Sequence, residues 1–499
     1  MPEDLPRLIR FLVEKLGVRL RKRDQALDHE FFLLDLSEWK LRLSDRTPFL
    51  RVSARQLQSL PTAELVASVR AAIHKEHLNR HLPIVVAEGR SPDLREALGR
   101  HIPYCAFVDD GDVDEILAPP SSERRLLELL CEQLPLETLA PYEISSPVTG
   151  SRFFGREYEI RTILNHPQTD YAIVGVRRIG KTSLLLELKR RLQEMGDEGV
   201  HFFDCSDFHS ADDYIQAVAT EVDIRRRERM TFQKFPNLLR VKSFQGKRPL
   251  VFLLDEVDHL IEFDRLENWA LLNTLRASSI KGFCRYVLTG YRTVIEESLK
   301  EQAPLYNFVT ALPLGSLSRP ETERLVTVPM EHLGVSFERR AELVGQIAQQ
   351  TAGHPNFVQF YCYTLVQLLD REGRRCISPG DLVAVHGDQE FERYVFRTFT
   401  ANTTDLEKAV VYGMVMDRDE SFTPREVDVC LKKRRVFATA GELEQALDNL
   451  RTACVLEKQG QAFGFAVPIL PRLLRDHYDL DYLFAKARED GKRGGQEHA

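Results

Sequence analysis

Residues 171–188 read YAIVGVRRIGKTSLLLEL, a stretch that passes from a short apolar run through two glycines into an apolar helix pattern. Apolar runs follow again at residues 250–254 and 284–288, with segments of helical spacing between them. Strands that alternate with helices favour a parallel sheet with crossover helices. The sequence therefore predicts an α/β fold built around this stretch.

The loop between the first strand and its helix has the G-x4-G-K-T pattern, which is suited to phosphate. Glycines let the backbone wrap closely around phosphate oxygens, and the helix N-terminus directs its N–H groups at them. We expect Lys181 to reach the β- and γ-phosphates and the Thr182 hydroxyl to ligate Mg²⁺. The predicted phosphate-binding residues are Gly175, Val176, Arg177, Arg178, Ile179, Gly180, Lys181, Thr182 and Ser183.

Two acids, Asp255 and Glu256, follow the apolar run 250–254. Ligands of open α/β sheets bind at the carboxyl ends of the strands, so both side chains are expected beside the phosphate loop. Asp255 is predicted to hold Mg²⁺ through water, and Glu256 to polarise the water that attacks the phosphate. The alternative is a strand that ends in a solvated acidic turn.

The third run, 284–288, ends in Thr289-Gly290-Tyr291-Arg292. A polar or cationic side chain at this strand end can sense the γ-phosphate from beside the acidic pair. Thr289 and Arg292 are both candidates, and the alternative for Arg292 is an ion pair with surface acids.

Four motifs, in this order, resemble the AAA+/STAND branch of P-loop ATPases, especially the archaeal-type ATPases. Residues 153–159 (FFGREYE) are similar to its hhGRExE box, and residues 177–183 to its RRxGKTS loop. Residues 288–292 (LTGYR) fall at the sensor-1 strand, and residues 353–356 (GHPN) resemble the GxP motif of a helical lid. The resemblance covers about residues 150–480.

The resemblance implies a Mg²⁺-dependent ATPase that binds ATP and releases ADP and phosphate. It places Phe154, Gly155, Arg156 and Pro355 near the adenine, and it favours Arg292 as the γ-phosphate contact. In ring-forming relatives a trans-acting arginine precedes a phenylalanine ahead of the lid. Asn307 stands at that position here. A slow, ligand-gated switch with a protein partner or self-association therefore fits better than a motor.

Two other arginines, Arg276 and Arg285, remain candidates to act in trans. Residues 224–248 are basic, with nine cations against one acid and with interleaved phenylalanines. This stretch is either a contact for nucleic acid or an acidic partner, or a solvated helix.

The C-terminal pattern at 405–480, three helices, a hairpin and a helix, resembles a winged helix. Its third helix, 442–451, would enter the major groove of DNA, but it holds three acids and one arginine, and the acids would repel the DNA phosphates. The nearby run 432–435 is basic. A protein contact is favoured over DNA. A DNA-associated ATPase of origin-recognition or conflict-system type and a nucleotide-gated scaffold with little hydrolysis stay as alternatives.

The N-terminal region is predicted to be α/β, because strand patterns at 83–87 and 104–108 flank a helix that opens at Ser91-Pro92. Glu38-Trp39-Lys40 faintly resembles a nuclease motif, and Glu88 with the acids at 109–114 a Toprim metal site. The spacing of both is poor, and a ligand-binding or protein-docking module is favoured.

The 499 residues carry 68 cations and 75 acids, a net charge of −7 that disfavours a protein coating nucleic acid. No run approaches the roughly 20 apolar residues of a membrane span, so a cytoplasmic protein with free thiols is expected. The predicted fold is a P-loop NTPase parallel sheet with helical lid and winged helix, preceded by an α/β domain. The predicted domains are 1–146, N-terminal; 150–312, ATPase core; 313–398, lid; 399–484, winged helix; and 485–499, flexible tail.

Overall fold

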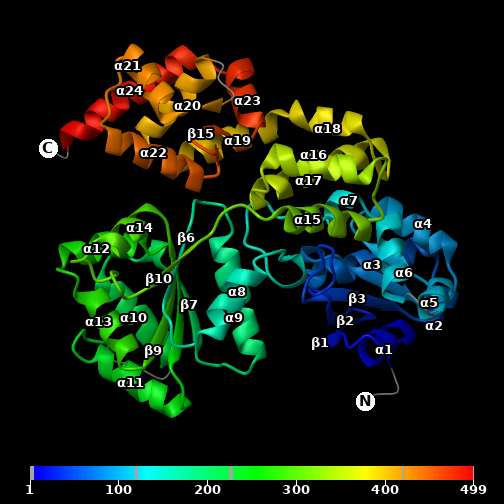
Figure 1. The fold of residues 1–499 in the computed structure, drawn as a ribbon. Coiled ribbons are helices and arrows are strands. Elements are labelled where there is room, and N and C mark those ends of the chain that lie inside the picture. Colours follow the sequence, from blue (N-terminus) through cyan, green and yellow to red (C-terminus); the bar gives the residue numbers. More distant parts are fainter. Residues whose placement is uncertain (1–4, 119–121, 224–228, 418–420, 498–499) are drawn as a thin grey trace.

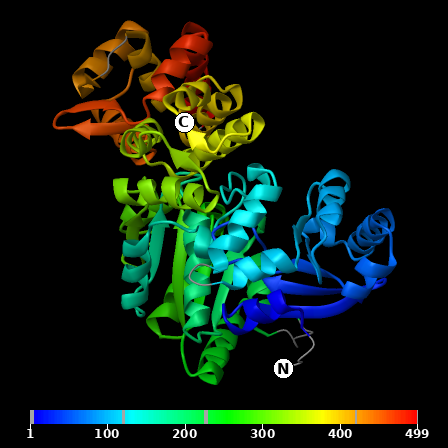
Figure 2. The same cartoon turned by 90° about the vertical axis from the view of Figure 1, so that its right-hand side faces the viewer.

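Figure 1 shows the computed structural model, which describes residues 5–118, 122–223, 229–417 and 421–497. We refer to residues 5–144 as the N-terminal module, 150–313 as the core, 319–402 as the lid and 405–497 as the C-terminal module. The N-terminal module lies beside the core, with α8 and α9 between the two sheets. Figure 1 also shows the C-terminal module above the core and the lid above the N-terminal module, and Figure 2 shows the same arrangement turned by 90°.

The core is a five-stranded sheet in the order β10-β6-β9-β8-β7, and all neighbouring strands are parallel. Its elements are α8 (Glu157–Asn165), β6 (Tyr171–Val174), α9 (Lys181–Glu194), β7 (Val200–Asp204), α10 (Ala211–Val222), α11 (Phe235–Gly246), β8 (Leu250–Asp255), α12 (Asp258–Leu266), α13 (Ala270–Ile280), β9 (Cys284–Gly290), α14 (Arg292–Leu299) and β10 (Thr310–Pro313). The predicted parallel α/β sheet is confirmed.

Both faces of this sheet are buried, which explains why its strands are continuous apolar runs. Ile173, Leu253 and Val287 belong to the hydrophobic core that includes the α9 leucines. Their neighbours Phe252 and Tyr286 belong to the core on the opposite face, under α10 to α13. Helices α8 and α9 cover one face and α10 to α14 the other (Figure 1).

The N-terminal module contains a mixed sheet in the order β1-β2-β3-β4-β5. Its elements are α1 (Arg7–Glu14), β1 (Arg19–Ala26), β2 (His29–Asp35), β3 (Thr47–Val52), α2 (Ala54–Ser59), α3 (Thr62–Lys75), β4 (Ile84–Ala87), α4 (Pro92–His101), β5 (Ala106–Val108), α5 (Asp110–Leu117), α6 (Ser122–Gln133) and α7 (Leu136–Leu139).

The predicted β4-α4-β5 unit is present and parallel. The antiparallel pairs β1 with β2 and β2 with β3 were not predicted. Strand β1 reads RLRKRDQA and is exposed along all but its last residue, so no apolar alternation marks it. It is an edge strand, held by backbone pairing to the buried β2 rather than by burial of its own side chains.

The lid and the C-terminal module are mainly helical. The lid contains α15 (Arg319–His332), β11 (Ser336–Phe337), α16 (Arg340–Thr351), α17 (Pro355–Glu372), β12 (Cys376–Ile377), α18 (Pro379–His386) and α19 (Gln389–Asn402). The C-terminal module contains α20 (Asp405–Asp417), β13 (Ser421–Phe422), α21 (Pro424–Lys433), α22 (Ala440–Thr452), β14 (Leu456–Gln459), β15 (Ala462–Phe465), α23 (Ile469–His477) and α24 (Leu480–Glu497).

Two predicted boundaries differ from the structure. Helix α19 runs across the predicted lid limit at 398, because Val395 and Phe399 continue one buried face without a helix breaker. Helix α24 continues to Glu497, so most of the segment from 485, which was predicted as a flexible tail, is helical. Phe484 and Ala487 are buried in the first half of α24, which packs on α20 and anchors the helix.

None of the described helices combines the length and the apolar character that crossing a bilayer requires.

Candidate functional site

The phosphate loop joins β6 to α9 in a conformation that requires glycine at two positions. A Cβ on Gly175 would lie 2.7 Å from the Leu314 carbonyl oxygen, closer than atoms can pack. Gly180 has a φ of 100°, in the region that side chains disfavour. It is the residue directly before the first turn of α9. The loop therefore brings backbone N–H groups to a helix N-terminus, which is the arrangement for holding an anion.

Lys181 lies beneath this loop, with its side chain only 4% exposed. Its ammonium donates hydrogen bonds to the carbonyl oxygens of Gly175 (2.9 Å) and Val176 (3.2 Å), and it lies 3.8 Å from a Glu256 oxygen. Burial lowers the pKa of Lys181, and the charges of Glu256 and Asp255 oppose this shift. A cation is thus held between the loop and the acidic strand end.

The carboxyl ends of β6, β8 and β9 meet at the loop, as predicted. The Thr182 hydroxyl donates to Oδ2 of Asp255 at 2.6 Å, and the Thr289 hydroxyl donates to Oδ1 of the same carboxylate. Asp255 is almost completely buried. Thr289 also accepts a hydrogen bond from the Glu256 backbone N–H at 3.2 Å. Thr289 therefore positions both acids.

Glu256 occupies a left-handed backbone conformation, with a φ of 50°. Such a conformation costs about 1 kcal/mol or more for a residue with a side chain, and it is typical of functional sites. The Glu256 side chain is 34% exposed. It is one of the residues that line the cavity at the loop.

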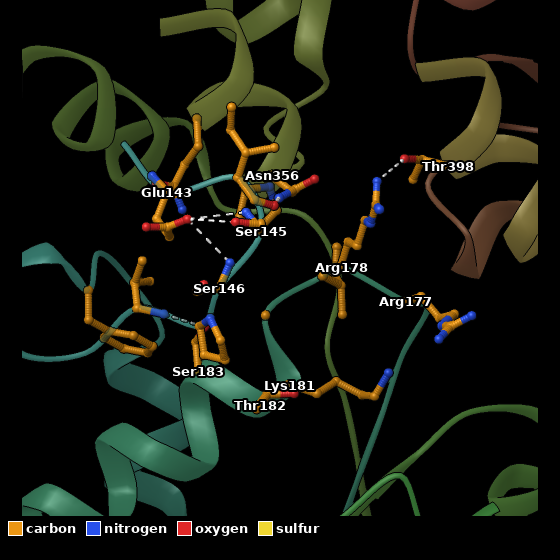
Figure 3. Close-up of a pocket in the computed structure, with 18 of the residues that line it drawn as sticks. Glu143, Ser145, Ser146, Arg177, Arg178, Lys181, Thr182, Ser183, Asn356 and Thr398 are labelled. Carbon is orange, nitrogen blue, oxygen red and sulfur yellow. Dashed lines mark hydrogen bonds between the residues drawn. The ribbon is translucent and has the colours of Figure 1, made fainter. Parts of the chain in front are cut away.

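A cavity of about 480 Å³ opens over the loop. Its wall comes from the loop, the 143–148 linker, the start of α17 and the end of α19. In Figure 3, Arg177, Arg178 and Lys181 lie along one side, and Glu143, Ser145 and Asn356 lie across from them. The predicted residues in the wall are Phe154, Arg156, Arg177, Arg178, Ile179, Gly180, Lys181, Thr182, Ser183, Glu256 and Pro355. Gly155, Gly175, Val176, Asp255 and Arg292 lie outside it.

Arg156, predicted near an adenine, forms hydrogen bonds that connect the core to the lid. Its guanidinium donates to the carbonyl oxygens of Ile179 (3.2 Å) and Gly315 (2.6 Å), and its backbone N–H donates to Glu321 of α15. It is 5% exposed, and burial lowers its pKa. Gly155 is needed because a Cβ there would approach Glu321 to 2.8 Å.

Arg292 begins α14, two residues after the end of β9. Asp258 fixes this helix start by accepting hydrogen bonds from the N–H groups of Tyr291, Thr293 and Val294. The guanidinium is directed to the C-terminal module, where it pairs with Glu407 at 2.6 Å. Burial lowers the Arg292 pKa, but the Glu407 carboxylate more than offsets this, and the net shift is upward. The structure thus places the predicted γ-phosphate contact against α20.

Of the two arginines predicted as trans-acting candidates, Arg285 does not fit that role. It is 5% exposed and donates to the carbonyl oxygens of Thr169 and Ile163 in its own chain. Arg276, which contacts the Pro304 carbonyl oxygen at 3.5 Å, is partly buried and stays a candidate.

The basic stretch is only partly described, since Arg225, Arg226 and Arg227 lie outside the described residues. In the rest of it, Arg229, Lys242 and Arg248 pair with aspartates of the core. Phe235 is buried in the core, and Phe244 is 69% exposed. Ion pairing therefore offsets part of the charge that a polyanion contact needs.

Neither metal-site alternative of the N-terminal module forms a ligand cluster. Within the described ranges, no group of three or more acidic, histidine or cysteine side chains is arranged to hold a metal ion. Asp109 caps α5, Glu88 pairs with Arg51, and Glu38 lies 3.9 Å from Arg190 of α9.

Several cavity residues were not predicted from the sequence. They are Glu143, Asn356, Gln359, Arg397, Thr398 and Asn402. Asn356 and Gln359 of α17 hold the linker backbone, at Ile144 O (3.0 Å) and Glu143 N (2.8 Å). Asn356 directly follows Pro355 of the GxP-like motif, so the sequence could have indicated it as a site residue. No local sequence pattern indicates Arg397 or Asn402.

Comparison with known proteins supports the assignment of the core. Residues 165–292 match the family model described as AAA domain. No curated protein matches the sequence. Among solved structures, the Walker-type ATPase of Pyrococcus abyssi is 13% identical with a TM-score of 0.48, over 67% of this chain and 99% of that one. The Aeropyrum pernix ORC2 protein is 14% identical with a TM-score of 0.46, over 69% and 94%. Over residues 165–292, the chain is thus similar to the AAA domains of P-loop ATPases.

Proposed function

We propose that this protein binds Mg²⁺–ATP in the loop cavity and hydrolyses it to ADP and phosphate, slowly, as a molecular switch of AAA+/STAND type. The observation that carries the proposal is the convergence of Lys181, Thr182, Asp255 and Glu256 at one strand edge. The Thr182–Asp255 and Lys181–Glu256 distances of 2.6 and 3.8 Å bring these groups within reach of one phosphate chain.

The residues present fit a magnesium ion. A hydroxyl and a carboxylate oxygen already lie in contact at Thr182 and Asp255, and Mg²⁺ prefers such hard oxygen ligands, with water completing its shell. When bound, the ion neutralises charge on the phosphates. Thr289 holds Asp255 in place, and Glu256 orients the attacking water from the cavity wall.

Removal of magnesium tests this part of the proposal. We expect EDTA to lower the rate of ADP formation by at least about 100-fold, because the ion supplies several kcal/mol of stabilisation to the transition state. Added MgCl₂ should restore the rate. A rate that is the same with and without the chelator contradicts the assignment of Thr182 and Asp255 as the magnesium site.

Arg397 is an unpredicted candidate for a nucleotide contact. It lies on α19, lines the cavity, is exposed, and its side chain has no ion pair within the described part of the chain. We expect Arg397→Ala to weaken ATP binding about fivefold, as for one exposed charge-assisted hydrogen bond. Arg393→Ala, a matched change one turn earlier on α19, should leave the affinity unchanged. Fluorescence titration measures the affinities. Equal ATP affinities for the wild type, Arg397→Ala and Arg393→Ala argue against a contact between Arg397 and the nucleotide.

The switch part of the proposal concerns the lid and the C-terminal module. The order α20, β13, α21, α22, β14, β15, with the antiparallel sheet β13-β15-β14, supports a winged helix. Asn307 in place of a trans-acting arginine supports slow hydrolysis. We propose a protein partner or self-association as the output, since α22 carries few cations and Arg434 and Lys432 are paired with Asp417 and Asp428. Within the part of the chain that the structure describes, no specific contact favours the DNA-associated alternative.

A further inference from the structure

The junction of α19 and α20 binds two groups beside the phosphate loop. Oδ1 of Asn402 accepts a hydrogen bond from the Arg177 backbone N–H at 2.9 Å. The Asn402 carbonyl oxygen accepts one from Arg292 at 3.0 Å. The two Glu407 oxygens accept from the two terminal nitrogens of Arg292, at 2.9 and 2.6 Å. One short segment of chain thus occupies donors from both the loop and the end of β9.

Glu407 is 1% exposed, and a buried carboxylate is costly unless it is paired. Among the described residues, Arg292 is the one cation within ion-pair distance of it. Thr404 N and Asn449 Nδ2 donate to Glu407 as well, at 2.8 and 2.9 Å. These neutral donors come from the residue before α20 and from α22, so the charge of Glu407 is compensated by Arg292 of the core.

The donors that Asn402 and Glu407 occupy are suited to phosphate. The N–H of Arg177 belongs to the loop whose N–H groups present a positive dipole to an anion. The backbone that leads to Arg292 lies against this loop, because Gly175 N donates to Gly290 O at 3.2 Å, two residues before Arg292. A carboxylate is an anionic acceptor that pairs with arginine as phosphate does, and an asparagine side-chain oxygen accepts from the same backbone N–H donors.

We propose that Asn402 and Glu407 form a latch that competes with the terminal phosphate of ATP for Arg177 N–H and Arg292. The inference rests on the proposed function, and it names the regulation of that same site. Engagement of the γ-phosphate takes Arg292 from Glu407, which leaves a buried charge uncompensated and releases the start of α20. ADP, without this phosphate, leaves the latch closed.

Coupling between two equilibria is reciprocal, so a weaker latch must strengthen ATP binding. Glu407→Gln removes the charge and keeps the side-chain volume, and its single amide oxygen can still accept from Thr404 N or from Asn449 Nδ2, which bond to different oxygens of Glu407. We expect its affinity for a non-hydrolysable ATP analogue to rise about tenfold relative to wild type, with ADP affinity unchanged, because the lost pair is a charge-assisted one. Glu444→Gln, an exposed acid on α22, is the matched control and should keep the wild-type ratio of ATP to ADP affinity.

Asn402→Ala tests the other contact of the latch, because it removes the neutral hydrogen bond between Asn402 and the Arg177 N–H of the loop. We expect the ATP-to-ADP affinity ratio to rise about threefold in this variant. If circular dichroism shows that Glu407→Gln does not fold, the affinity ratio of Asn402→Ala alone tests the latch. In the wild-type protein, hydrogen exchange over α20 should become faster with the ATP analogue and not with ADP.

Affinity ratios equal to wild type in every folded variant overturn the latch, as does exchange over α20 that the analogue leaves unchanged. Failure of the proposed function is a separate outcome. In that case the wild-type protein itself binds neither nucleotide, whereas a protein that binds both with an unaltered ratio keeps its nucleotide site and loses only the latch.

Discussion

Lys181→Ala is expected to lower the affinity for ATP by about 100-fold or more, since it removes a buried, charge-assisted donor to phosphate. The ammonium lies at the centre of the site, between two loop carbonyl oxygens and Glu256. Its removal also leaves the Glu256 charge without a cation 3.8 Å away, and that negative charge then repels the phosphates. Titration calorimetry with ATP and Mg²⁺ measures the change.

Lys189→Ala, on the same helix α9 and away from the loop, is the matched control and should bind ATP as the wild type does. Both variants should unfold at similar temperatures, so that a loss of affinity reports the site. Micromolar ATP binding retained by a folded Lys181→Ala protein contradicts the assignment of the loop.

Glu256→Gln is expected to separate binding from hydrolysis. The amide keeps the shape of the side chain but cannot take a proton, so the rate of ADP formation should fall by about 10²- to 10⁴-fold. ATP affinity should stay within a few-fold of wild type, because Lys181 and the loop are unchanged. Phosphate release under single-turnover conditions measures the rate.

Glu262→Gln, an exposed acid on α12, is the control and should hydrolyse ATP at the wild-type rate. Equal and negligible hydrolysis in wild type and Glu256→Gln, with ATP bound by both, identifies a nucleotide-gated scaffold in place of an enzyme. This outcome removes the hydrolytic role of Glu256 and leaves the binding site intact.

The core was predictable because its signals are local. Strand β6 has the predicted limits of 171 and 174, and β8 and β9 begin at the predicted residues. A buried parallel strand is a short apolar run, and the side chain that follows it points to the shared edge. Asp255 and Thr182 therefore meet in the structure even though 73 positions separate them.

Elements without such a signal were missed. Strand β1 was missed because it is polar and exposed along most of its length, with ion pairs to Asp35 and Glu30 of β2 beside the backbone pairing. Helix α24 was missed because it contains glycines that suggest a tail. Thr289 was a candidate for phosphate sensing from its place at a strand end. Its hydroxyl and its contact with the Glu256 N–H show that it positions the acidic pair.

The order of loop, acidic strand and lid motif along the chain was sufficient to predict a phosphate site on a parallel sheet, since each motif encodes its own backbone geometry. The partners of Arg177 and Arg292 came from tertiary packing. Asn402 and Glu407 lie 225 and 115 positions away from them, on a helix end and a helix start with no distinguishing pattern. Which acid faces which arginine depends on how the lid and the C-terminal module pack over the core, and no local preference of the chain encodes that contact.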